Sequence, residues 1–153
     1  MDTSIKILFT VAGEILFLFN LISLIRGLLT LKKSGAVILA EKLTWIRVYA
    51  LMTFGVLAQI AFFVGLSGPN YYLFSLVSGF SVLYPNVMAS ECLFAYREKE
   101  LWFGFKRYEK GAVKAVMDQQ RRKNLNVLLE ERGGKQFVLR TTPALWEEIK
   151  THL

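Results

Sequence analysis

The sequence predicts a membrane protein with three transmembrane α-helices, followed by a small α+β domain that has an antiparallel sheet and a C-terminal helix. Hydrophobic residues make up 54% of the 153 residues, and they gather in three long runs. From residue 97 to 153 the chain changes to short apolar and charged segments, with 13 Lys or Arg against 8 Asp or Glu. We therefore divide it into a transmembrane domain, 1–96, and a basic domain, 97–153.

The three apolar runs predict helices at about 5–25, 45–66 and 71–92. Each run is long enough to cross a hydrocarbon core of about 30 Å, which takes about 20 helical residues. A cleaved signal peptide is the alternative for the first run. Its apolar stretch is longer than a signal peptide needs, and no small-x-small cleavage site follows it, so we expect three retained spans.

The distribution of Lys and Arg predicts how the spans are oriented. The short connection Ser67–Asn70 carries no basic residue, whereas the connection between the first two spans carries five. These five are Arg26, Lys32, Lys33, Lys42 and Arg47. Because basic connections stay inside, we expect the N-terminus outside and the C-terminal domain in the cytoplasm, in a bacterial inner membrane. The lone Cys92 fits that side, since it provides no disulfide framework.

The sequence of the basic domain predicts strands followed by a helix. Glu100–Tyr108 is aromatic and predicts a strand, and Ala112–Asp118 fits either a strand or a helix. Leu125–Glu131 and Lys135–Thr141 flank Gly133-Gly134, which predicts a hairpin with a two-residue turn. The C-terminal helix starts with Thr142 as N-cap and Pro143 at the first helical position, and its buried stripe is Leu145, Ile149 and Leu153.

The predicted hairpin needs cover on both faces. A two-residue turn places Leu129 opposite Val138 and Leu128 opposite Leu139, so apolar residues point to either side. One face can pack on the C-terminal helix around Trp146. The other face needs another strand of the domain, the membrane side or another subunit. A domain this small is marginal alone, which favours oligomerisation.

Small residues four apart occur in two spans: Ala61 with Gly65, and Ser75 with Gly79. This spacing lets helices approach closely. Because the pattern is common by chance in apolar runs, a contact within the bundle of one chain is the first expectation, and a contact between subunits is the alternative.

The basic residues of the domain are candidates for binding a ligand with several phosphates, if subunits bring them together around an axis. Arg grips phosphate oxygens in pairs, and aromatic rings can stack on bases. The candidate residues are Trp102, Lys106, Arg107, Arg121, Arg122, Lys123, Lys135 and Arg140, with Phe103 and Phe105 as further stacking surfaces. The alternative is solvated charge, or charge that faces anionic lipid.

Lys6, Glu14 and Asn20 interrupt the first apolar run and Gln59 the second, and the candidates for a role inside the membrane are Glu14, Asn20 and Gln59. An ionisable residue at membrane depth is costly unless it faces a partner, water or the bundle interior, so Glu14 is a functional candidate. The three residues can line a pore or seal the helices together. Alternatively, Glu14 is protonated and hydrogen-bonded within the bundle, or the first helix lies nearer the surface.

Enzyme chemistry finds no support in the sequence. His152 is the only histidine and Cys92 the only cysteine, and no metalloprotease, nucleophile-elbow or Walker motif occurs. We therefore expect no enzyme, no metal site and no cofactor.

The layout resembles that of the membrane effectors associated with type III CRISPR systems. The resemblance rests on the apolar runs that begin near Ile5, Val48 and Tyr71, and on the tail with its Arg and Lys clusters. It implies a homo-oligomer, expected as a tetramer, whose cytoplasmic domain binds a cyclic oligonucleotide such as cyclic oligoadenylate. The ligand then triggers disruption or depolarisation of the membrane in antiviral defence. The implied partners are this ligand and the lipid bilayer, and no long nucleic acid.

A hypothesis of another class is an interaction protein. An immunity protein, or one that excludes superinfecting or conjugating elements, acts by protein–protein contact within the membrane. This hypothesis predicts that the spans and the outer connection determine specificity, and that the basic tail tolerates loss of its charges.

Overall fold

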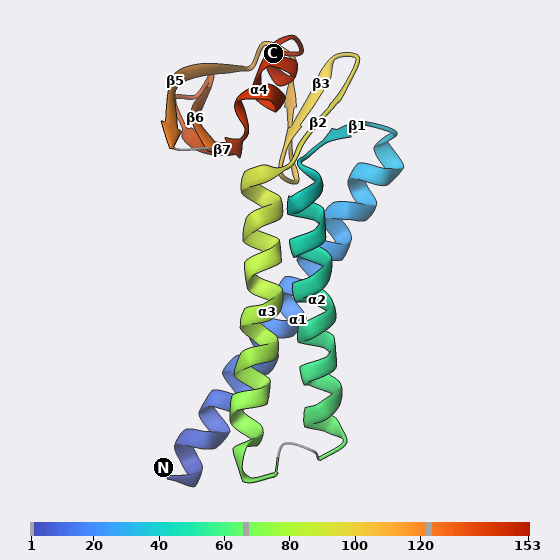
Figure 1. Cartoon of the computed structure of the whole chain (residues 1–153), viewed down its shortest axis with the longest axis vertical. Coiled ribbons are helices and arrows are strands. Elements are labelled where there is room, and N and C mark those ends of the chain that lie inside the picture. Colours follow the sequence, from blue (N-terminus) through green and yellow to red (C-terminus); the bar gives the residue numbers. More distant parts are fainter. Residues whose placement is uncertain (1, 66–67, 122–123) are drawn as a thin grey trace. The chain divides into compact units, whose positions relative to one another are not determined.

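The computed structural model describes residues 2–65, 68–121 and 124–153 (Figure 1). The chain forms two compact units. The first, the helical unit, consists of Met1–Arg26 and Ile46–Val87, and the second, the α+β unit, consists of Gly27–Trp45 and Met88–Leu153. The α+β unit thus contains the connection between the first two long helices as well as the C-terminal part of the chain.

Three long helices confirm the predicted helical part of the fold: α1 Thr3–Ser34, α2 Lys42–Phe63 and α3 Tyr71–Cys92. All three are long and apolar enough to cross a membrane. The first helix runs past its predicted end, because Leu28 to Leu31 continue a helix-compatible sequence up to Ser34 and Gly35. A short 3-10 helix, Gly68–Asn70, precedes α3.

The α+β unit holds two antiparallel sheets and a C-terminal helix, as predicted for its class. The first sheet has the order β1-β2-β3-β4 and the second the order β5-β6-β7. The strands are β1 Val37–Leu39, β2 Phe94–Arg97, β3 Glu100–Phe103, β4 Lys106–Glu109, β5 Val113–Arg121, β6 Asn124–Glu131 and β7 Gln136–Thr141, and the helix is α4 Pro143–Lys150.

Strand β1 lies in the connection between α1 and α2 and pairs with β2, which directly follows α3. Leu39 lies opposite Phe94, and Val37 opposite Tyr96. Residue patterns in the sequence do not predict this strand. Its pairing means that the α1–α2 connection and the segment after α3 lie on the same side of any bilayer that α2 and α3 cross.

The predicted hairpin exists, but its predicted register is wrong by one residue. Leu128 pairs with Val138, and Leu129 with Phe137. The loop has three residues, because the N–H of Gly134 donates to the carbonyl of Glu131 at 2.8 Å and Gly134 adopts a φ of 79°. A turn closed by a left-handed glycine adds one residue to the two-residue turn that the sequence suggested.

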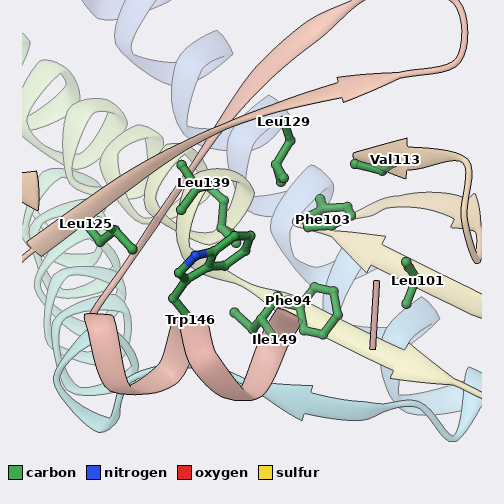
Figure 2. Close-up of a cluster of buried hydrophobic side chains, with 10 residues drawn as sticks. Phe94, Leu101, Phe103, Val113, Leu125, Leu129, Leu139, Trp146 and Ile149 are labelled. Carbon is green, nitrogen blue, oxygen red and sulfur yellow. The ribbon is translucent and has the colours of Figure 1, made fainter. Parts of the chain in front are cut away.

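The new register gives β6 a simple alternation. Leu125, Val127 and Leu129 are buried, whereas Leu128 is only half-buried on the opposite face. Figure 2 shows the buried side chains gathered with those of α4 and the first sheet. The core consists of Phe94, Leu101, Phe103, Val113, Leu125, Val127, Leu129, Leu139, Trp146 and Ile149.

Helix α4 closes this core. Thr142 is its N-cap residue with an extended backbone, and Pro143 is at the first position, as predicted, although the Thr142 side chain makes no capping bond. Of the predicted stripe, Ile149 is buried, while Leu145 and Leu153 are partly buried against the core. The largest buried side chain of the helix is Trp146, which the stripe did not include.

Candidate functional site

The helical unit contains a hydrogen-bonded polar cluster centred on Glu14. Gln59 Nε2 of α2 donates to Glu14 Oε2 of α1 at 2.6 Å. Ser75 Oγ of α3 lies 2.9 Å from Glu14 Oε1, and Ser78 Oγ donates to Gln59 Oε1 at 2.6 Å. This cluster, Glu14 with Gln59, Ser75 and Ser78, therefore joins all three long helices, and Gln59, Ser75 and Ser78 are buried.

The cluster has more acceptors than hydroxyl hydrogens. Ser75 Oγ also contacts the carbonyl oxygen of Thr10 at 2.8 Å, and Ser78 Oγ contacts the carbonyl oxygen of Ser75 at 2.8 Å. Each hydroxyl has one hydrogen, so two hydrogens face four acceptor oxygens. An additional N–H or O–H donor at position 14 could therefore donate a hydrogen bond to Ser75 Oγ, which would leave the Ser75 hydrogen for the carbonyl of Thr10.

The third predicted intramembrane residue, Asn20, lies outside this cluster. Its Nδ2 donates to the carbonyl of Leu16 at 2.8 Å, and its Oδ1 accepts from Asn86 Nδ2 at 3.0 Å. The residue pattern thus identifies Glu14, Asn20 and Gln59 but not their partners on α3. The available signal was the presence of polar residues in an otherwise apolar run.

Glycine lets α1 and α3 come close enough for these bonds. A Cβ atom on Gly13 would lie 2.4 Å from Ser75 Oγ and 2.6 Å from the Ser75 carbonyl oxygen, and one on Gly79 would lie 2.7 Å from the Gly13 carbonyl oxygen. The small pair Ser75 and Gly79 is therefore used within the chain's own bundle. In the second pair, Gly65 has a positive φ beyond the end of α2.

In the α+β unit, three predicted ligand-binding cations contact carboxylates. Lys106 Nζ lies 3.0 Å from Glu131 Oε2, and Arg140 Nε lies 3.1 Å from Glu91 Oε2. Arg107 pairs with Glu100 across the β3–β4 hairpin. The hydrogen bond that Lys106 donates to Glu131, together with its hydrogen bond to Tyr108, raises the pKa of Lys106 above its ordinary value. All three cations are more than half exposed, so these are surface ion pairs.

The aromatic residues proposed for stacking are mostly covered. Trp102 is 3% exposed, and Phe103 packs in the core with ring centroids 5.2 Å from Phe94 and 5.2 Å from Phe137. Phe105 lies against Gly27, where a Cβ atom would come within 2.4 Å of its ring. In this structure the rings of Trp102 and Phe103 offer no open face to a base.

The predicted cations are spread over both sheets, with Lys106 and Arg107 on β4 of the first sheet. Lys135 follows the β6–β7 loop, and Lys106 contacts Glu131 at that same end of β6. Arg121 lies opposite Asn124 at the other end, where Arg140 pairs with Asn126. The two ends of β6 are about 23 Å apart. Arg122 and Lys123 lie outside the described residues, and the remaining cations do not form one site in one chain.

In the described parts of the chain, no group of three or more His, Cys, Asp or Glu side chains could hold a metal ion. Comparison with known proteins gives no match to a protein-family model, a curated protein or a solved structure. The candidate functional features of the chain are therefore the polar cluster of the helical unit and the surface charges of the α+β unit.

Proposed function

We propose that the protein is a membrane-anchored interaction protein, whose three helices fix the α+β unit at a membrane and whose activity is contact with another protein. The observation that carries the proposal is the polar cluster. Glu14, Gln59, Ser75 and Ser78 bond to one another within one chain. Polar side chains that satisfy each other between helices stabilise a bundle, whereas a conducting pathway keeps them turned toward water.

The charges of the α+β unit support the same proposal. Lys106, Arg107 and Arg140 each have a carboxylate within contact distance, so the surface alternates in sign. A mixed surface suits a protein partner, because complementary charges select the partner and its orientation. A ligand with several phosphates would have to displace these carboxylates first.

The proposed location is a bacterial inner membrane with the α+β unit in the cytoplasm. The pairing of β1 with β2 supports a common side for both basic segments. The positive-inside rule favours the cytoplasm for that side.

The test is a flux measurement on the full chain in liposomes filled with a self-quenching dye. The expected result is an intact barrier both without ligand and with cyclic or linear oligoadenylates. The variant Ser78→Leu, which removes one hydroxyl from the cluster, serves as a matched comparison, because it tests whether loosening the bundle opens a path. Dye release by the unaltered protein after addition of an oligoadenylate would overturn the proposal.

A second candidate is the ligand-triggered membrane effector. It is favoured by the register of the second sheet, which places Arg121 and Arg140 near the same end. Subunits that meet at this end would bring several cations together. Calorimetric titration of the detergent-solubilised chain with cyclic and linear oligoadenylates at several salt concentrations tests it. Ring-selective binding that Arg140→Glu abolishes supports this candidate, and weak binding that fades equally for all anions as salt rises removes it.

A further inference from the structure

The connection between α1 and α2 carries three exposed lysines: Lys32, Lys33 and Lys42. Lys32 and Lys33 are in the last turn of α1, and Lys42 is the first residue of α2. Between residues 27 and 45 the only acidic residue is Glu41. We call Lys32, Lys33 and Lys42 the connection lysines.

The connection lysines have no anionic partner in the described parts of the chain. Among these residues, no carboxylate forms an ion pair with any of the three ammonium groups. Lys106, Arg107 and Arg140 differ in this respect, because each contacts a carboxylate of the same chain. The positive charge of the connection therefore stays available for a partner outside the chain.

Other groups already bond to two carbonyls at the end of α1, where a lysine side chain can also bind. Ser34 Oγ donates to the carbonyl of Leu31 at 2.7 Å. Arg97 Nη1 donates to the carbonyl of Ser34. The end of the helix is thus capped without the ammonium groups of Lys32 and Lys33.

The acidic residue of the connection belongs to the start of α2. The carbonyl of Glu41 accepts hydrogen bonds from the N–H groups of Thr44 at 2.9 Å and Trp45 at 3.3 Å. A carboxylate at this end of a helix is favoured by the helix dipole. Glu41 therefore has a reason to be in the connection that is separate from the lysines.

The helix lengths place the connection lysines near lipid headgroups. Helix α2 has 22 residues and is about 33 Å long from Lys42 to Phe63. A hydrocarbon core is about 30 Å thick, so a helix of this length that crosses it has its first residue among the headgroups. Helix α1 has 32 residues and is about 48 Å long, so its last turn extends beyond the core as well.

Apolar side chains lie close to the lysines in the sequence. Leu29, four residues before Lys33 on α1, is 48% exposed, and Leu43, next to Lys42, is 51% exposed. A lysine extends its apolar stem along such surface and keeps its ammonium group in the polar layer. This combination suits the boundary between acyl chains and headgroups.

We propose that the connection lysines bind the phosphate groups of anionic phospholipids. The inference goes beyond the proposed function, because the ligand is a lipid and not a protein. The bilayer is the occupant because both helices that flank the connection are long and apolar enough to cross a membrane. The ammonium groups donate charge-assisted hydrogen bonds to phosphate oxygens, and a negative leaflet attracts them. The positive-inside rule concerns how a chain inserts, whereas this binding selects lipids after insertion.

The test uses Trp45 as a reporter. Trp45 is partly exposed at the start of α2, whereas Trp102 and Trp146 are 3% and 2% exposed. Brominated lipids quench a tryptophan that they contact, so the quenching comes mainly from Trp45. The full chain is placed in liposomes of phosphatidylglycerol and phosphatidylcholine, with one of the two lipids brominated at a time. The two quenching curves give the enrichment of the anionic lipid next to Trp45.

We expect phosphatidylglycerol to be enriched several-fold next to Trp45 at low salt. Lys33→Gln combined with Lys42→Gln, one lysine from each helix, should reduce the enrichment by at least half. Lys99→Gln combined with Lys110→Gln removes the same charge from two exposed strand connections and should leave the enrichment unchanged. Equal amounts of both lipids next to Trp45 in the unaltered chain, or an equal loss in both double variants, would overturn the proposal.

The salt dependence of the unaltered chain keeps the test decisive if a variant does not fold. Raising the salt concentration from about 0.1 M to about 1 M should reduce the enrichment several-fold, because salt screens exposed charges. An enrichment that does not change with salt would contradict binding through the lysines. Inorganic phosphate is compared with sodium chloride at equal ionic strength. Equal enrichment in both supports a lipid ligand, and loss in phosphate alone would overturn it in favour of a site for free phosphate.

Discussion

The two units of the chain bury opposite kinds of residue. In the helical unit Ser75 and Ser78 are fully buried, while Phe19 is 70% and Phe63 74% exposed. In the α+β unit Phe94 and Leu129 are fully buried, and Lys and Glu side chains lie on the surface. Each unit therefore buries the side chains that are least favourable in its surroundings, which are polar side chains for the helical unit and apolar side chains for the α+β unit. Hydrocarbon accepts apolar side chains and penalises unpaired polar groups, whereas water does the reverse.

The same comparison separates the sources of stability. The α+β unit depends on removing apolar surface from water, which grows with buried area. The helical unit gains nothing from covering apolar surface in lipid, so it depends on close packing at Gly13 and Gly79 and on hydrogen bonds between helices. Loss of a buried apolar side chain should therefore destabilise the α+β unit most. Loss of close packing or of an interhelical hydrogen bond should destabilise the helical unit most.

The largest expected effect is the loss of the central side chain of the α+β core. Trp146→Ala removes the side chain that joins α4 to the second sheet, and we expect a loss of about 3–5 kcal/mol in the free energy of unfolding. Near-ultraviolet circular dichroism of the detergent-solubilised chain during heating measures it. Glu148→Ala, on the exposed side of the same helix, is the control and should change the melting temperature little. Equal shifts for both variants would contradict the described core.

The next effect concerns close packing of the helices. Gly13→Leu places side-chain atoms where Ser75 already lies, and overpacking of this kind costs about 1–3 kcal/mol. Unfolding in mixed micelles of increasing denaturing detergent measures the loss. Ala50→Leu also introduces a leucine side chain, but on the exposed surface of α2, and should be tolerated. If Gly13→Leu is as stable as Ala50→Leu, α1 and α3 are not in contact at this point.

A smaller effect separates hydrogen bonding from charge at position 14. Glu14→Gln keeps the shape and brings N–H donors to acceptors that lack a hydrogen, so stability should be unchanged or higher. Glu14→Leu removes the bonds to Gln59 and Ser75, and we expect a loss of about 1 kcal/mol. The same micelle titration compares the two variants. A Gln variant clearly less stable than the unaltered chain would contradict this arrangement of donors and acceptors.

The smallest effect is the pH dependence of one surface carboxylate. The hydrogen bond from Gln136 and the nearby Lys114 lower the pKa of Glu130. A carboxylate with a lowered pKa in the folded state stabilises that state at higher pH, and the contribution disappears as pH falls through the folded-state pKa. Melting temperature followed from about pH 7 to about pH 3 should fall slightly less for Glu130→Gln than for the unaltered chain. High salt should reduce the difference, because Glu130 is exposed.

Residue patterns predicted the parts of the fold that depend on composition. Long apolar runs sufficed for α1, α2 and α3, and Thr142-Pro143 sufficed for the start of α4. The register of β6 with β7 could not be predicted, because Gly133-Gly134 suits a two-residue turn and the chain uses a three-residue loop instead. Strand β1 is three residues long, and only its pairing with β2, far along the chain, makes it a strand.

For the candidate sites, the residues could be predicted from the sequence but their contacts could not. Glu14 and Gln59 can be identified from the sequence because polar residues are rare in apolar runs. Their connection through Ser75 and Ser78 depends on how each helix is turned about its own axis, which the residue pattern does not determine. The basic residues were grouped by charge alone. Their separation along β6 and their ion pairs depend on strand register and on neighbours such as Glu91 and Glu131.

The most direct test of the sealed, polar interior is thiol labelling inside the bundle. Ser78→Cys in the Cys92→Ser background places a thiol of similar size in the polar cluster, and Lys110→Cys serves as an accessible control. Liposomes that carry the full chain are treated with a membrane-impermeant maleimide from either side, and then again after denaturation. We expect position 78 to react only after denaturation, while Lys110→Cys reacts from the side of the membrane on which it lies. Reaction at position 78 in intact liposomes would reveal a water-filled path and contradict a sealed polar cluster between the helices.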